Sequence, residues 1–93
     1  METKRVRLGD IDVVYQRRGQ GEPVVFIHGI AEDHSSWLSV LDRLEPGISA
    51  YAVDLRGMGE TTTGNGQGTA SQLAGDLLAF LEQVTGPAIC VGF

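Results

Sequence analysis

The sequence has 93 residues, of which 42% are hydrophobic and 20% charged, and this balance is typical of one small globular domain rather than of a disordered or fibrous chain. Twelve acidic and seven basic residues give a net charge of −5. We therefore expect no nucleic acid partner, because phosphate binding needs a basic surface.

Neither a targeting segment nor a membrane span is evident in the sequence. The first ten residues lead into no apolar signal-type segment, and no stretch approaches the roughly 18 apolar residues that cross a bilayer. We expect a cytoplasmic protein with no membrane partner. The single cysteine, Cys90, cannot form an internal disulfide and is expected to lie in the core.

The first predicted elements form an antiparallel hairpin. Residues 5–8 and 11–17 alternate in character, and Gly9-Asp10 supplies a two-residue connection. One side of this hairpin is apolar and comprises Val6, Leu8, Ile11, Val13 and Tyr15. After a turn at 18–22, Pro23 precedes the run 24–27, which is apolar on both faces, as in an internal parallel strand.

Two helices and two further strands follow. Asp33, Ser35 and Ser36 are candidate caps for a helix that carries Trp37, Leu41 and Leu44 and ends at Pro46-Gly47. A strand at 48–53 precedes a glycine-rich loop at 56–68. Thr69 and Gln72 form a capping box for a second helix, which Gly86-Pro87 ends. The apolar stripe of that helix comprises Leu73, Leu77, Phe80, Leu81 and Val84.

The last predicted element is a buried apolar strand at 88–91. The complete order predicts an α/β fold, in which two crossover helices and an antiparallel hairpin accompany a mostly parallel sheet. Residues 1–93 belong to a single domain in this interpretation and make up its amino-terminal part, without an internal repeat or linker.

Three motifs follow predicted strands. His28-Gly29-Ile30 follows the strand 24–27, and a glycine there permits a sharp turn that aims a backbone N–H at a developing oxyanion. From this dipeptide alone, a turn with a purely structural histidine is the alternative. The second motif runs from Asp54 to Gly59, and we assign its aspartate and arginine to loop architecture. The third is Gly92-Phe93.

Together with Trp37, these motifs resemble the amino-terminal portion of the α/β-hydrolase fold superfamily, up to the G-x-S-x-G nucleophile elbow. Thr61 stands where that family usually has serine. The resemblance implies a partial α/β-hydrolase fold and esterase-like hydrolysis of an ester or related bond through a covalent intermediate. It implies a small-molecule ester-like substrate and no cofactor.

The same resemblance assigns the site residues. The backbone amide of Ile30 is the expected oxyanion donor, Gly29 and His28 support the loop, and Ile30 and Phe93 line the substrate site. In the family the nucleophile, the acid and the general base come later in the chain, so we expect the 93 residues to be inactive alone. Whether the nucleophile is Ser, Asp or Cys stays open.

Other functions remain as alternatives. A short non-catalytic binding or dimerisation module on a partial sheet is the main rival, with self-association through an exposed edge strand at 88–91. A nucleotide site at Gly64–Gly68 is disfavoured, because these glycines do not follow a strand directly. His28, Asp33 and His34 lack the spacing of a zinc site, so we expect no metal there and interpret them as solvated loop residues.

Overall fold

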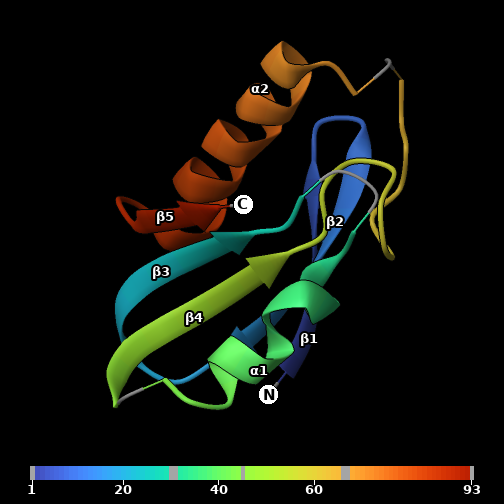
Figure 1. The fold of residues 1–93 in the computed structure, drawn as a ribbon. Helices are drawn as coiled ribbons and strands as arrows, with labels where there is room; N and C mark the ends of the chain where they lie inside the picture. Colours follow the sequence, from blue (N-terminus) through green and yellow to red (C-terminus); the bar gives the residue numbers. More distant parts are fainter. Residues whose placement is uncertain (1, 30–31, 45, 66–67, 93) are drawn as a thin grey trace.

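A computed structural model describes residues 2–29, 32–44, 46–65 and 68–92. Within these residues, five strands form one sheet in the order β1-β2-β4-β3-β5 (Figure 1). Their bounds are β1 Glu2–Leu8, β2 Ile11–Arg18, β3 Gly21–Ile27, β4 Gly47–Val53 and β5 Ile89–Gly92. Figure 1 shows α2 (Ala70–Phe80) on one face of this sheet and the short α1 (Leu38–Leu41) on the other.

The strand pairing confirms the α/β prediction. β1 and β2 form the antiparallel hairpin, and β2 also pairs with β4 in the antiparallel sense. β3 lies inside the sheet and is parallel to both β4 and β5. The carboxyl ends of these three parallel strands therefore meet at one edge, where open α/β sheets usually bind their ligands.

The α2 face of the sheet holds the larger apolar cluster. Phe80 is 2% exposed and packs edge-on against Tyr15, with 5.0 Å between the ring centroids. The apolar side predicted for the hairpin faces this helix, and Leu77, Leu81 and Val84 pack at its margin. The chain continues beyond α2 in a wider π-type segment, Leu81–Thr85, and leaves the helical conformation at Gly86, whose φ is 69°.

The opposite face is covered by less helix than the sequence suggests. A 3₁₀ turn at His34–Trp37 runs into α1, which has four residues and ends at Leu41. Asp33 caps this segment by accepting a hydrogen bond from the Ser35 amide. Trp37 is buried against Phe26, with 5.2 Å between ring centroids. Leu44 lies beyond the helix but still packs against this cluster.

The last strand is an exposed edge strand, as the alternative of self-association expected, and is not buried as its apolar residues suggest. β5 forms an edge of the sheet, and all four of its residues are exposed, including Ile89 at 56% and Val91 at 37%. The prediction that Cys90 lies in the core is wrong, because its thiol is exposed on this edge strand. An apolar strand is buried only where another layer or strand covers it.

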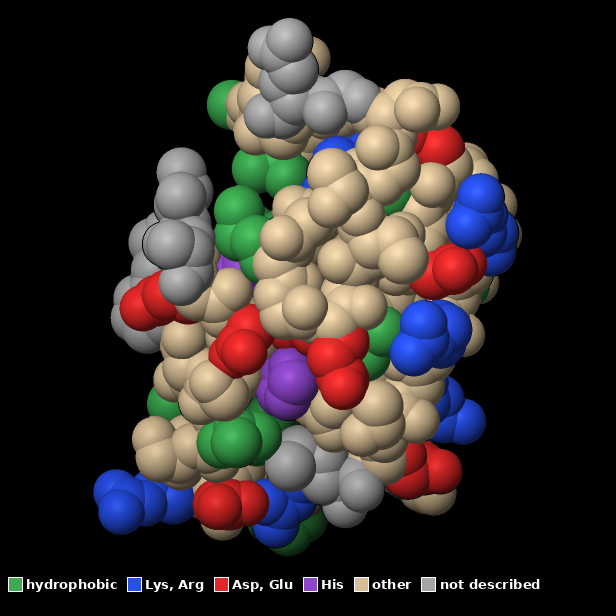
Figure 2. Space-filling view, turned by 90° about the vertical axis from the view of Figure 1, so that its right-hand side faces the viewer, with side chains coloured by type: hydrophobic (Ala, Val, Ile, Leu, Met, Phe, Trp, Pro, Cys, Tyr) green, Lys and Arg blue, Asp and Glu red, His purple; other side chains and the backbone are tan. Residues whose placement is uncertain are grey.

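Charged side chains of both signs lie near one another on one face of the molecule. On the face in Figure 2, Lys and Arg side chains lie beside Asp and Glu side chains, and a histidine reaches the surface between acidic groups. Two of the exposed ion pairs join Arg7 to Asp12 and Arg18 to Asp42. Among the described residues, α2 and α1 are both too short to span a bilayer.

Candidate functional site

His28 links the end of β3 to the segment that follows β4. It is 2% exposed. Its Nε2 accepts a hydrogen bond from the Leu55 amide at 2.9 Å, and its Nδ1 lies 2.7 Å from the Gly29 carbonyl oxygen. An acceptor at Nε2 and a carbonyl beside Nδ1 assign the proton to Nδ1 in a neutral ring. His28 therefore contacts the backbone of both loops at this edge of the sheet.

Asp54 makes a second link between the same two segments. Its side chain is fully buried. Oδ1 accepts hydrogen bonds from the backbone amide of His34 at 2.7 Å and from His34 Nδ1 at 2.8 Å, and Oδ2 accepts from the Glu60 amide at 3.0 Å. A buried carboxylate needs such donors to replace its hydration. Asp54 thus joins the loop after β3 to the loop after β4.

Two hydrogen bonds also form within the loop between His28 and His34. The Glu32 amide donates to the Gly29 carbonyl at 3.2 Å, and the Gly29 amide donates to Glu32 Oε2 at 3.0 Å. Ile30, the expected oxyanion donor, lies outside the described residues, as does Phe93. Their predicted roles stay predictions, and Gly29 and His28 are placed at the predicted edge of the sheet.

The glycine of the second motif has a steric role. Gly59 has a φ of 54°, and a Cβ at this position would lie 2.5 Å from Asp54 Cγ. Its small size lets the next amide reach the Asp54 carboxylate. Thr61, which replaces the usual serine, donates its hydroxyl to the Asp54 carbonyl at 2.7 Å and accepts from the Val14 amide at 2.9 Å. The hydroxyl retained here fixes the loop to β2.

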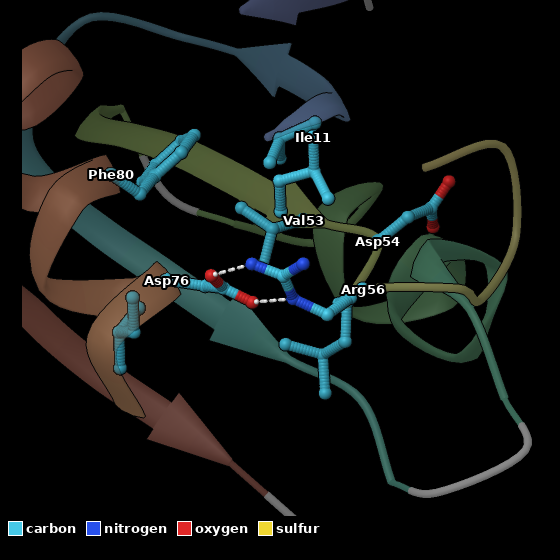
Figure 3. A pocket seen from close by; sticks show the side chains of 9 residues that line it. Ile11, Val53, Asp54, Arg56, Asp76 and Phe80 are labelled. Atoms are coloured by element: carbon cyan, nitrogen blue, oxygen red, sulfur yellow. Dashed lines mark hydrogen bonds and ion pairs between the residues drawn. The ribbon is translucent and has the colours of Figure 1, made fainter. Parts of the chain in front are cut away.

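Arg56, the arginine of the same motif, contacts the hairpin turn and α2. Its side chain is 6% exposed and pairs through two nitrogens with each of two carboxylates, Asp76 on α2 and Asp10 in the hairpin turn. It also donates to the carbonyls of Thr63 and Asn65. Figure 3 shows its guanidinium facing Asp76, while the Asp54 carboxylate points away from that pair. The two charged residues of the motif therefore brace different parts of the fold, as loop architecture.

The electrostatics follow from these contacts. The hydrogen bonds from Arg56 and then from the Asn65 amide hold the pKa of Asp10 well below its ordinary value. Asp76 and then Asp10 raise the pKa of Arg56 above its usual range. The Ser35 hydroxyl and then the Ser35 amide lower the pKa of Asp33. These groups carry fixed charges at neutral pH and are suited to holding the structure.

The interpretation of the histidines as solvated loop residues is wrong. His28 is buried and the His34 side chain is 19% exposed, and both are hydrogen-bonded. Local sequence patterns could not predict the contact between His34 and Asp54, because the two residues are 20 positions apart. Over residues 2–29, 32–44, 46–65 and 68–92, no group of three or more His, Cys, Asp or Glu side chains could hold a metal ion.

A small cavity lies between α2 and the sheet, beside the Arg56–Asp76 pair. Its volume is about 20 Å³, room for about one water molecule. Ile11, Val53 and Phe80 are among its lining residues (Figure 3). A cavity of this size cannot hold an organic substrate. A larger hollow of about 190 Å³, lined among others by Gly19, Leu44 and Gly47, lies where β3 and β4 begin, away from the motifs that follow the strands. The candidate site is the opposite edge of the sheet, where the motifs and the two linked loops lie.

Comparison with known proteins identifies the family. Residues 24–93 match the model of a family described as the alpha/beta hydrolase family. The chain is 36% identical over 81 residues to a dihydrolipoyllysine-residue acetyltransferase component of the acetoin cleaving system of Cupriavidus necator. The aligned region covers 83% of this chain and 22% of that protein. The chain is 33% identical over 87 residues to epoxide hydrolase 1 of Siraitia grosvenorii, covering 90% and 28%.

A solved structure supports the same fold. A thermophilic esterase from Thermogutta terrifontis superimposes with a TM-score of 0.86 at 26% identity, over 97% of this chain and 36% of that one. The chain thus spans about a quarter of the length of the two curated relatives described above. The match covers nearly all of this chain but a minor part of each relative.

Proposed function

Because the chain belongs to the alpha/beta hydrolase family, we propose that its sheet edge forms the anion-binding wall of a hydrolase active site. The reaction in this proposal is hydrolysis of an ester or a related bond through a covalent intermediate. The substrate is a small molecule, and the backbone amide of Ile30 donates to the oxyanion. The names of the relatives, an esterase and an epoxide hydrolase among them, support this reaction class.

One observation carries the proposal. His28 and Asp54, at the ends of two neighbouring parallel strands, tie the loop after β3 to the loop after β4. An anion-binding amide is effective when it is held in place before the reaction, because no free energy is then spent on reorientation. β5 pairs with β3 in register, with Val91 opposite Phe26. A nucleophile placed after β5 therefore falls beside the loop that begins at His28.

In this proposal the 93 residues stabilise charge and do not attack the substrate. Loss of the nucleophile or base of a catalytic triad lowers turnover about a million-fold, whereas one oxyanion donor contributes about 2.7–4 kcal/mol. His28 and Asp54 are both committed to hydrogen bonds within the loops. We therefore propose that the attacking group and the general base come from other segments. The relatives, of which this chain covers 22% and 28%, have such additional segments.

A chimaera tests the proposal. Residues 1–93 replace the part of the Thermogutta terrifontis esterase on which they superimpose, 36% of that chain, and the rest of the esterase is kept. We expect the chimaera to hydrolyse a nitrophenyl ester, and substitution Gly29→Pro, which removes a backbone N–H and restricts the turn, to abolish turnover. The control is Gly75→Ala on α2, an exposed glycine whose ideal Cβ has no heavy atom within 4 Å, which should leave turnover unchanged. A folded chimaera without esterase activity would contradict the proposal.

A second candidate function follows from β5. Its exposed apolar residues at the sheet edge favour pairing with another strand, which a binding or dimerisation module would use. This candidate needs no covalent chemistry. Two measurements distinguish these functions. Esterase activity of the chimaera favours the hydrolase active site, and self-association of the 93-residue chain favours the binding or dimerisation module.

A further inference from the structure

The loop after β3 is held from both sides by histidines that use different ring nitrogens. His28, before the loop, accepts the Leu55 amide with Nε2. His34, after it, places Nδ1 2.8 Å from Asp54 Oδ1. Since both partners follow β4 directly, the two contacts join the residues that flank this loop, His28 and His34, to one short segment.

The contact between His34 and Asp54 has a buried acceptor. The Asp54 carboxylate is fully buried, and all the contacts described for it come from loop groups: the amide and ring of His34 and the amide of Glu60. A buried carboxylate that loses one of these donors bears an uncompensated desolvation cost. The position of His34 is therefore coupled to that of Asp54.

We infer that His34 and Asp54 are positioning residues, which fix the carboxyl-terminal end of the anion-binding loop as His28 fixes its amino-terminal end. The catalytic part of this inference rests on the proposed function. The structural part does not. A loop anchored at one end can shift its amides, and a displacement of about 1 Å can cost 100-fold in rate.

The different nitrogens make the inference testable with isosteric variants. An asparagine amide group matches the position of a histidine Nδ1, whereas the longer glutamine matches Nε2. At position 34, asparagine can therefore keep the donor to Asp54, and glutamine cannot. At position 28 the order is reversed, because glutamine can present an acceptor to Leu55 and asparagine is too short.

The first experiment measures amide hydrogen exchange in the 93-residue chain. We expect His34→Gln to reduce protection of the Glu60 amide about tenfold, and His34→Asn to leave it near the wild-type value. For the Leu55 amide, His28→Asn should reduce protection and His28→Gln should preserve it. Equal effects of Asn and Gln at position 34 would overturn the inference. Circular dichroism identifies any variant that has unfolded.

The second experiment repeats the substitutions in the esterase chimaera. His34→Gln should lower kcat between about 10-fold and 100-fold with little change in KM, and His34→Asn should restore it. If the exchange result holds but kcat is unchanged, the positioning role is wrong. If the unsubstituted chimaera is inactive, the proposed function fails instead, and the exchange experiment still decides whether the anchors exist.

Discussion

Gly59 shows how one residue shapes the loop after β4. Its backbone is left-handed, and Asp54 occupies the space where a side chain would begin. Gly9 in the hairpin turn has a similar φ, 59°, but no heavy atom lies within 4 Å of its ideal Cβ. The two glycines therefore separate the cost of backbone strain from the cost of displacing the buried carboxylate.

We predict that Gly59→Ala lowers the free energy of unfolding more than Gly9→Ala does. Backbone strain of about 1–3 kcal/mol applies to both, and displacement of Asp54 adds to it at position 59 alone. Urea unfolding followed by Trp37 fluorescence measures the difference. Equal losses in the two variants would mean that the contact with Asp54 is without consequence.

Asp10 gives the chain a specific acid sensitivity. Contacts with Arg56 and Asn65 depress its pKa in the folded state below the ordinary value of 3.8, so the contribution of Asp10 to stability is present at neutral pH. As the pH falls below the unfolded pKa, the unfolded chain takes up the proton first and this contribution is lost.

Asp10→Asn is therefore expected to reduce stability at neutral pH and to flatten the loss of stability below about pH 4. The control is Asp42→Asn, which removes an exposed ion pair with Arg18. Thermal unfolding from pH 7 to pH 2, followed by circular dichroism, provides the measurement. An unchanged acid slope in Asp10→Asn would contradict the assignment.

At the scale of elements, Arg56 joins three segments that are distant in sequence: the hairpin turn, the loop after β4 and α2. Asp10 is 46 positions from Arg56, and Asp76 is 20. Each carboxylate receives two bonds from a planar guanidinium, which a lysine cannot reproduce. The arrangement fixes α2 over the apolar face of the hairpin.

Arg56→Lys should therefore destabilise the chain although the charge is kept. Loss of even one bond between charged groups costs about 1.5–3 kcal/mol. Arg18→Lys, at an exposed pair, should cost less than about 1 kcal/mol. Urea midpoints compare the two variants, and a midpoint for Arg56→Lys equal to that of Arg18→Lys would show that the bidentate geometry is unimportant.

β5 is an edge strand, and the residues of β5 do not specify what packs against its free edge. It carries no charged residue, whereas β1 at the other edge carries Glu2, Lys4, Arg5 and Arg7. Charges on an edge strand oppose pairing with another chain. We propose that two copies of the chain associate through their β5 edges.

Sedimentation velocity tests this proposal. We expect concentration-dependent association of the 93-residue chain that Ile89→Lys abolishes, since a charge on the edge opposes strand pairing. The control is Leu78→Lys, at an exposed apolar position on α2, which should leave association unchanged. A compact monomer at high concentration would contradict the proposal.

At the scale of the whole molecule, local patterns predicted the elements and long-range contacts completed the site. Alternation in the hairpin and the motifs at strand ends were sufficient for the fold and for the placement of His28. The links from His34 to Asp54 and from Arg56 to Asp10 join residues 20 and 46 positions apart, and no local spacing encodes them. The exposure of Cys90 depends on what covers β5, which its own residues do not specify.

The central claim is that this chain shapes a charge-stabilising wall and supplies no attacking group. The direct measurement is the burst of nitrophenol released from a nitrophenyl ester, compared in the purified 93-residue chain and in the esterase chimaera. We predict no burst from the chain and a burst close to one equivalent from the chimaera. A stoichiometric burst from the chain itself, retained through purification, would contradict the claim.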